Sequence, residues 1–147
     1  MAIEDKLKEL GVEIKPPEPG GLLAPAVKVG NLVFTSGNTS PEQGKVGKDL
    51  TVDEAAEAAR KSIINVLGNL VTVCPDLNKV KRIVKLLGMV NCAEGFYNTP
   101  AVINGATKFL HELFGRDIGW HARSAIGVYQ LPGNAAVEIE MIVEVEE

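Results

Sequence analysis

The sequence predicts an α+β domain in which two helices pack on one face of a single sheet. Apolar side chains recur at helical spacing over residues 51–73 and 100–114. Runs rich in β-branched residues occupy 26–36, 79–91 and 125–145, which is typical of strands. The 147 residues match the length of one domain, and no internal repeat divides them.

The N-terminal part is expected to precede the domain proper, with residues 1–20 as a short helix and connector and residues 21–147 as the domain. Apolar residues recur at helical spacing over 3–10, and Gly11 follows them as a stop signal. Prolines and glycines dominate residues 16–21, which indicates an extended connector.

Three strands are predicted from local signals. Residues 26–29 and 32–36 are apolar runs, and Gly30-Asn31 between them favours a tight turn. Residues 37–50 carry Gly, Asn, Ser, Pro and Lys and are expected to form a loop. Residues 79–91 contain enough β-branched side chains to predict a further strand.

Two long helices are predicted between these strands and the C-terminus. Thr51-Val52-Asp53-Glu54 is a capping box, so a helix is expected to begin there and to run to about Val73, before Pro75. A second helix is expected over 100–114, with Pro100 near its start.

The last quarter is predicted to be a hairpin, in which residues 125–131 and 136–145 flank a turn at Pro132–Ala135. Apolar residues alternate with glutamates along the second strand, so one face of it is apolar and the other acidic.

Matching the apolar faces of these two strands turns Ile126 and Val128 toward the helices. Arg123 then shares the opposite face with Glu138. That face mixes small, aromatic and charged residues, which favours burial against another subunit. A buried arginine is costly unless a carboxylate pairs with it. Arg123 could therefore bind a ligand carboxylate through its planar fork, or form an ion pair with a glutamate of the sheet. Glu138 is either a general base for water or an ordinary solvated or paired carboxylate.

The other candidates have structural explanations beside functional ones. Trp120 is either a core or interface anchor or a platform for substrate. Ser36 and Gly37 either line a pocket or simply end a strand. Asn104 on a helix usually faces solvent. His121 would point the same way as the arginine two residues later if a strand begins there, and is otherwise a loop histidine.

Composition excludes several function classes. Fifteen Lys and Arg against nineteen Asp and Glu give a net charge of −4, which disfavours nucleic-acid binding. No apolar run is long enough to span a membrane, and the charged start Met1–Lys6 lacks a signal core, which predicts a cytoplasmic protein. Motifs for a nucleotide, a metal or a serine nucleophile (GxGxxG, Walker, HExxH, paired Cys, GxSxG) are absent from the sequence, so chemistry without a cofactor is expected.

One combination of motifs is distinctive. The segment Val29–Gly37 (VGNLVFTSG) is followed far downstream by Ala122–Ala125, Leu131-Pro132 and Val137–Glu140. Together these segments resemble the RidA/YjgF/YER057c/UK114 family, also called endoribonuclease L-PSP-like, over about residues 21–146. The longer N-terminus and the insertion Gly115–Trp120 are similar to the second, less characterised YjgF-like subgroup.

The resemblance implies a chorismate-mutase-like fold and a homotrimer whose sheets form a central barrel, with a ligand cleft between each pair of subunits. Archetypal members hydrolyse reactive enamines and imines, such as 2-aminoacrylate, to 2-oxo acids and ammonia without a cofactor. By resemblance, Arg123 clamps the substrate carboxylate, and Glu138 holds the attacking water. Ser36 and Gly37 would line the cleft, with Asn104 nearby.

Two positions depart from the archetype and leave the substrate open. Leu23 stands where archetypal deaminases carry a tyrosine, and Ala125 stands where they often carry a cysteine. Both positions would shape the pocket without supplying its charge. Two other functions therefore remain open: a non-catalytic module that binds a small carboxylate metabolite, and an L-PSP-type ribonuclease, which the net charge disfavours.

Overall fold

The computed structural model describes residues 2–147. The strands are β1 (Ala26–Val29), β2 (Leu32–Thr35), β3 (Asn38–Thr39), β4 (Val80–Asn91), β5 (Ala122–Val128) and β6 (Val137–Val145). The helices are α1 (Ile3–Leu10), α2 (Val52–Leu70) and α3 (Thr99–Gly119), with short 3-10 turns η1 (Leu77–Lys79) and η2 (Pro132–Asn134). The strands form one sheet in the order β1-β2-β6-β4-β5, and the short β3 pairs with β6.

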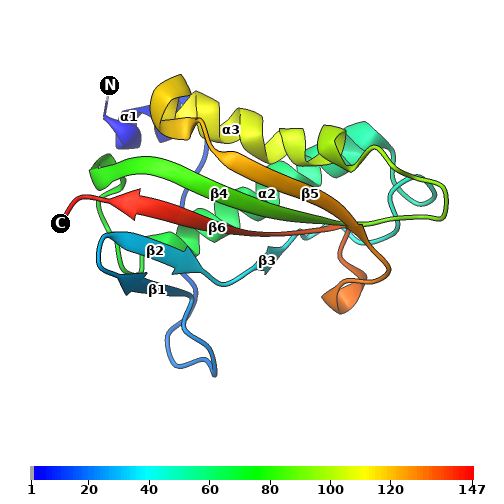
Figure 1. Ribbon diagram of the computed structural model, residues 1–147, viewed down its shortest axis with the longest axis horizontal. Coiled ribbons are helices and arrows are strands. Elements are labelled where there is room, and N and C mark those ends of the chain that lie inside the picture. The colour runs from blue at the N-terminus through cyan, green and yellow to red at the C-terminus, as the bar shows by residue number, and fades with distance from the viewer. Residues whose placement is uncertain (1) are drawn as a thin grey trace.

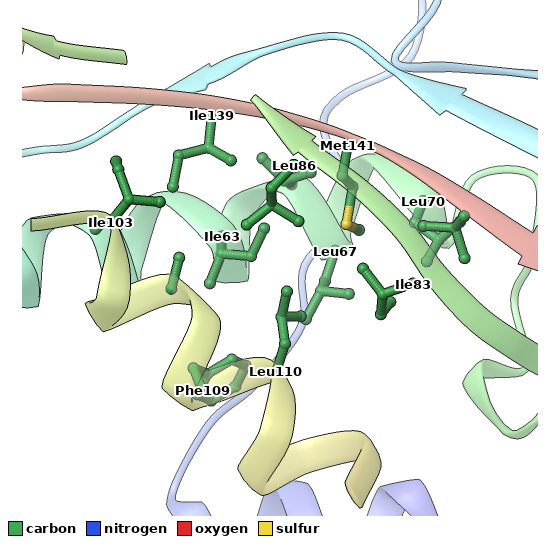
Figure 2. Close-up of a cluster of buried hydrophobic side chains, with 14 of the residues drawn as sticks. Ile63, Leu67, Leu70, Ile83, Leu86, Ile103, Phe109, Leu110, Ile139 and Met141 are labelled. Carbon is green, nitrogen blue, oxygen red and sulfur yellow. The ribbon is translucent and has the colours of Figure 1, made fainter. Parts of the chain in front are cut away.

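The helices α2 and α3 lie on the same face of the sheet, as predicted (Figure 1). The core fills the space between them and the central strands β4 and β6 (Figure 2). Its largest fully buried side chains come from both layers: Ile63, Leu67 and Leu70 of α2, Ile103, Phe109 and Leu110 of α3, Ile83 and Leu86 of β4, and Ile139 and Met141 of β6. No element among residues 2–147 covers the opposite face, where Phe34 is 42% and Ile126 45% exposed. We call it the uncovered face.

Both long helices differ from prediction at their C-terminal ends. The capping box of α2 is present, since the Glu54 amide donates to the Thr51 hydroxyl at 3.2 Å and the Thr51 amide to the Glu54 carboxylate at 3.0 Å. However, α2 ends at Leu70 rather than about Val73, because β-branched residues before a proline disfavour a continued helix. Helix α3 runs past residue 114, through a break at Gly115 (φ 81°), to Gly119.

The predicted C-terminal hairpin is wrong. Strands β5 and β6 are not neighbours, because β4 lies between them, parallel to β5 and antiparallel to β6. The β5 strand also begins earlier than expected and ends at Val128. Sequence spacing favours a hairpin, but the longest strand of the sheet, β4, offers both of its edges for pairing. The turn at η2 therefore leads across the end of β4 instead of folding β5 directly onto β6.

The predicted orientation of β5 is wrong as well. Arg123 pairs with Leu86, which in turn pairs with Met141, and both partners are buried under the helices. Arg123 therefore lies on the helix-covered face. Ile126 shares its row with Glu138 and lies on the uncovered face. Matching apolar faces misled the prediction because the uncovered face is itself partly apolar.

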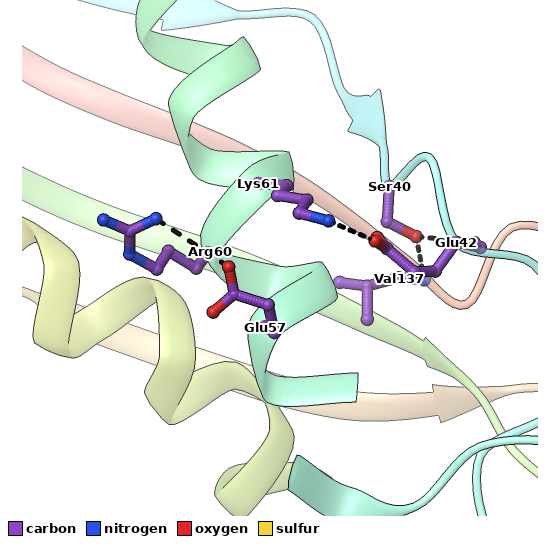
Figure 3. A network of polar contacts seen from close by, with 6 residues as sticks. All are labelled: Ser40, Glu42, Glu57, Arg60, Lys61 and Val137. Carbon is purple, nitrogen blue, oxygen red and sulfur yellow. Dashed lines mark hydrogen bonds and ion pairs between the residues drawn. The ribbon is translucent and has the colours of Figure 1, made fainter. Parts of the chain in front are cut away.

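A polar network fixes the start of β6 against the rest of the domain (Figure 3). The Val137 amide donates to the Ser40 hydroxyl at 3.2 Å, and that hydroxyl donates to the Glu42 carbonyl at 3.0 Å. Lys61 of α2 binds the Glu42 carboxylate at 2.6 Å. The loop after β3 is thereby tied to both α2 and β6, which holds the residues around β3 in place beside Glu138.

The N-terminal segment packs onto the same core. Ile3, Leu7 and Leu10 of α1 contact the buried cluster. The connector passes so close to α2 that a Cβ at Gly68 would lie 2.1 Å from the Lys15 carbonyl oxygen. The division after residue 20 stays a prediction. No helix among residues 2–147 combines the length and apolar character needed to cross a bilayer.

Candidate functional site

Arg123 of β5 is held by two polar side chains of α3. Its Nη1 donates to Asn104 Oδ1 at 2.8 Å and to Thr107 Oγ1 at 3.2 Å. These two bonds use both hydrogens of Nη1, whereas a guanidinium has five N–H donors in a planar fork. The Nη2 and Nε donors have no hydrogen-bond partner in residues 2–147. One edge of the fork thus remains for a carboxylate.

Arg123 does not form the alternative ion pair with a glutamate of the sheet in the single chain. Across the described part of the chain, no carboxylate oxygen lies within 4.0 Å of the Arg123 guanidinium. Burial lowers the pKa of Arg123 from its ordinary value, but an arginine stays protonated in proteins. The structure therefore presents a half-buried, oriented cation without its own counterion.

Sequence reasoning considered Asn104 but missed Thr107. The two residues stand three positions apart on α3, which places them on the same side of the helix. Lys108 and His111 lie on this side of α3 as well, so the spacing of Asn104 and Thr107 by itself gives no signal of a polar partner on the neighbouring strand.

Ala125 lies on the same face as Arg123, two residues further along β5. It pairs with Gly88, and its side chain packs against the edge of the buried cluster. Its carbonyl accepts a hydrogen bond from the Thr99 hydroxyl at 2.9 Å. The structure thus groups Arg123, Asn104 and Ala125, and we call these three residues with Thr107 the arginine half-site.

Glu138 lies on the other face of the sheet. Its side chain rests directly on Gly37, since a Cβ at Gly37 would lie 2.5 Å from Glu138 Oε2. Pairing of Thr39 with Glu138 in the β3–β6 ladder sets this approach. Burial, and secondarily the charge of Glu140, raises the pKa of Glu138 above its ordinary value. A carboxyl with a raised pKa is better matched to accepting a proton near neutral pH.

Ser36 connects Gly37 to the N-terminal connector. The Ser36 hydroxyl donates to the Ala24 carbonyl at 2.7 Å, and its amide donates to the Pro25 carbonyl at 2.8 Å. Leu23, which is 76% exposed, shares a pocket of about 460 Å³ with Ser36 and Gly37. Glu138 does not line this pocket, but it contacts Gly37. We call Leu23, Ser36, Gly37 and Glu138 the glutamate half-site.

The two half-sites are separate within one chain. Arg123 pairs with Leu86 and Glu138 pairs with Met89, on opposite sides of β4. At ordinary strand spacing and rise, their Cα atoms are roughly 14 Å apart, and their side chains leave opposite faces of the sheet. A single chain therefore cannot bring the guanidinium and the carboxylate to one small ligand.

Trp120 belongs to neither half-site. It follows α3, is 59% exposed, and its carbonyl accepts hydrogen bonds from the Arg82 guanidinium, which also lies over the indole ring. Its side chain is thus not a core anchor in the single chain. No cluster of three or more His, Cys, Asp or Glu side chains suited to a metal ion occurs between residues 2 and 147.

Comparison with known families agrees with this architecture. Residues 10–145 match the family described as YjgF/chorismate mutase-like and as a proposed endoribonuclease. The chain belongs to this family. The family resemblance and the chorismate-mutase-like fold predicted from the sequence are thereby confirmed.

Two curated relatives are informative. Protein TCP17 of Trypanosoma cruzi is 43% identical over 101 residues, which are 69% of this chain and 63% of that protein. The chain thus spans less than two thirds of the length of this relative. A 2-iminobutanoate/2-iminopropanoate deaminase of Dermatophagoides farinae is 30% identical over 134 residues, covering 88% of this chain and 91% of that protein.

Two solved structures share the fold over nearly the whole chain. A protein of unknown function from Agrobacterium tumefaciens is 37% identical, with a TM-score of 0.90 over 99% of this chain and 94% of that one. TdcF of E. coli, solved with bound serine, is 26% identical, with a TM-score of 0.61 over 91% of this chain and 94% of that one.

Proposed function

We propose that the protein is a cofactor-free deaminase that hydrolyses small reactive 2-imino acids, and the enamines that tautomerise to them, to 2-oxo acids and ammonia. The site is a cleft between neighbouring copies in a homotrimer, where the arginine half-site of one copy faces the glutamate half-site of the next. The observation that carries this proposal is the oriented Arg123 guanidinium, which has hydrogen-bonding partners on one nitrogen and no counterion in residues 2–147.

Arg123 supplies the substrate clamp. Its remaining N–H donors match the two oxygens of a carboxylate, and a 2-imino acid carries that group next to its reactive carbon. The positive charge of the Arg123 guanidinium also withdraws electron density from the C=N carbon next to the bound carboxylate. A fixed carboxylate therefore holds that carbon in one place for attack by water, which lowers the entropic part of the barrier.

Glu138 supplies the base. It takes a proton from water while the water oxygen bonds to the imine carbon, and the C=N pair of electrons moves to nitrogen. The nitrogen takes this proton back from Glu138, which gives a neutral carbinolamine. Glu138 then removes the hydroxyl proton and delivers it to the amino nitrogen, so that the C=O forms as the C–N bond breaks and ammonia leaves. The sum is imine plus water giving 2-oxo acid plus ammonia, so no redox partner is needed. The raised pKa of Glu138 favours this proton transfer.

The uncovered face supports the assembly. Its exposed apolar side chains form registered neighbours on β1 and β2, Val27 beside Phe34 and Val29 beside Leu32. A contiguous apolar patch of this kind marks an interaction surface. Strand β5 has an unpaired edge at the end of the sheet, next to Arg123. A neighbouring copy that covers this edge with its own uncovered face would bring a second Glu138 toward the first copy's arginine.

The names of two relatives agree in chemistry with this proposal. The mite protein is a deaminase of 2-iminobutanoate and 2-iminopropanoate, and TdcF binds serine, which also carries a carboxylate beside a nitrogen-bearing carbon. Neither name identifies the substrate of this chain, and Leu23 and Ala125 give its cleft a different lining from that of archetypal deaminases.

A trapping assay tests the proposal. A partner enzyme generates short-lived imino acids from several amino-acid precursors, and a scavenger amine captures whatever survives. We expect the wild-type protein to suppress trapping and Arg123→Ala to lose this effect. Arg116→Ala is the matched control, because Arg116 is exposed beyond the break in α3. Equal trapping with and without wild-type protein for every precursor would refute the deaminase.

A non-catalytic module that binds a small carboxylate is the second candidate, and the serine bound to TdcF favours it. Clamping through Arg123 serves binding and catalysis equally. Calorimetric titration with a stable 2-oxo acid, run beside the trapping assay, separates the two functions: an enzyme turns over the imine and binds the acid, whereas a binding module only binds the acid. The net charge of −4 disfavours binding of RNA and therefore a ribonuclease.

A further inference from the structure

Thr107, which holds Arg123, is itself held by a histidine. The Thr107 hydroxyl lies 3.2 Å from Nε2 of His121, and Nδ1 of the same ring lies 2.8 Å from the Gly119 carbonyl oxygen. These contacts join β5 to α3 just before the strand begins. His121, Thr107 and Arg123 therefore form one continuous hydrogen-bonded chain.

The direction of every bond in this chain follows from the chemistry of its ends. A carbonyl oxygen can only accept, so Nδ1 of His121 carries the proton that goes to Gly119. In the neutral ring Nε2 then has a lone pair, and the Thr107 hydroxyl must donate to it. The Thr107 oxygen is left to accept from Nη1 of Arg123, which can only donate.

We propose that His121 is a positioning residue for Arg123: its Nδ1-protonated neutral form orients the Thr107 hydroxyl, which fixes the guanidinium for a carboxylate ligand. The proposal rests on the part of the proposed function in which Arg123 binds a carboxylate, and it does not require turnover. Without His121 the Thr107 hydroxyl can rotate and turn its hydrogen toward Arg123. That hydrogen would repel the N–H donors of the guanidinium.

The charges around His121 favour the neutral ring. The titratable groups facing it are His111 on α3, whose ring lies edge-on at 6.1 Å, and Arg123 on β5. Arg82 of β4 binds the carbonyl of the preceding Trp120, and within residues 2–147 no carboxylate oxygen approaches the His121 ring to 4.0 Å. Burial lowers the pKa of His121 below its ordinary value, and the nearby His111 and Arg123 lower it further, against the opposite effect of the hydrogen bond to Gly119.

Ligand binding at Arg123 should therefore change the pKa of His121. An imidazolium would donate from Nε2 to the Thr107 oxygen instead of accepting from its hydroxyl, which breaks the chain that fixes Arg123. The carboxylate ligand therefore binds the neutral form more tightly, and the pKa of His121 falls when the ligand binds. By linkage, the same coupling appears as a dependence of ligand affinity on pH around the titration of His121.

Nitrogen NMR of the protein tests the geometry around His121. Near pH 7.5 we expect the His121 proton on Nδ1 and a lone pair on Nε2. Saturation with 2-oxobutanoate, a stable 2-oxo acid, should lower the titration midpoint of His121, and Arg123→Gln should remove this response. A proton on Nε2, or a midpoint that ignores the ligand, would overturn the proposal.

Calorimetric titration of variants with 2-oxobutanoate tests the function of the chain. Thr107→Val and His121→Leu should each weaken binding roughly fivefold to tenfold, the effect of one hydrogen bond, and the double variant should be no weaker than either. Thr107→Ser and His121→Gln, which keep the hydroxyl and an acceptor, should restore affinity. Wild-type affinity in His121→Leu, additive losses or failure of wild type to bind would refute the positioning role. Binding with all these effects but no imine turnover would refute only the deaminase.

Discussion

Arg123 and Glu138 lie on opposite faces of one sheet, on strands that pair with the two edges of β4. Each is held by its own neighbours: Arg123 by Asn104 and Thr107, and Glu138 by contact with Gly37. The two halves of the proposed site thus lie too far apart within one chain to meet on a small ligand.

Replacing Arg123 by lysine should weaken substrate binding more than it slows the chemical step. Lysine keeps the charge but loses the planar fork and the two bonds to Asn104 and Thr107. We expect KM in the imine assay to rise roughly tenfold to a hundredfold, the effect of one or two charge-assisted hydrogen bonds, with a smaller fall in kcat. Arg116→Lys is the control and should be unchanged. An unaltered KM for Arg123→Lys would argue against a bidentate clamp.

Glu138→Gln should lower kcat roughly a hundredfold or more, because the amide cannot take a proton from water. In the wild type the carboxylate is the active form, so kcat should fall as pH drops, with a midpoint above the ordinary glutamate value of 4.5. Glu140→Gln is the matched control. It removes the neighbouring charge that raises the pKa of Glu138, so the midpoint should move to lower pH with kcat retained. A midpoint unaffected by Glu140→Gln would contradict the assignment.

Glu138→Gln should also stabilise the protein at neutral pH. The folded state raises the pKa of Glu138, so between 4.5 and that raised value it binds more protons than the unfolded chain, and wild-type stability falls as pH rises through this window. Glutamine avoids burying the charge. Urea unfolding at pH 7 should therefore show a higher midpoint for the variant, with the difference vanishing below pH 4.5. A destabilised variant at pH 7 would show that Glu138 has a stabilising partner instead.

Gly37→Ala should displace the Glu138 carboxylate without unfolding the domain. A Cβ at Gly37 would come within 2.5 Å of Glu138 Oε2, which is the far end of a flexible side chain and can move. We expect reduced kcat with a nearly unchanged urea midpoint. Combining Gly37→Ala with Glu138→Gln should add nothing to the loss caused by Glu138→Gln alone. Full activity of Gly37→Ala, or losses that multiply, would show that this contact does not position the base.

Local signals in the sequence predict most of the secondary structure. The capping box at Thr51 begins α2, and the alternation from Val137 to Val145 defines the buried face of β6. The order of the strands could not be predicted in this way, because strand pairing depends on contacts between residues that are distant in sequence. Nothing local to residues 125–145 reveals that β4 separates the two strands that were expected to form a hairpin.

The same limit explains the errors at the site. The sequence identifies Arg123 and Glu138 as chemically suited residues and places Glu138 on the correct face, but it places Arg123 on the wrong one, because both faces of the sheet contain apolar residues. Gly127, which lies on the same face as Arg123, leaves room on that face for Cys92, whose sulfur would lie 2.9 Å from an added Cβ. Thr107 was missed because a threonine on a helix carries no functional signal until its strand neighbour is known.

The most direct test of a site shared between copies is complementation between two inactive variants. Arg123→Ala and Glu138→Gln are co-expressed with different tags, and the mixed assemblies are purified through both tags and assayed for imine hydrolysis. If one copy supplies the arginine and the next the glutamate, each mixed trimer regains one of its clefts, so roughly one third of the clefts in the purified mixture become active. Assemblies that contain both variants and remain as inactive as each variant alone would contradict the shared site.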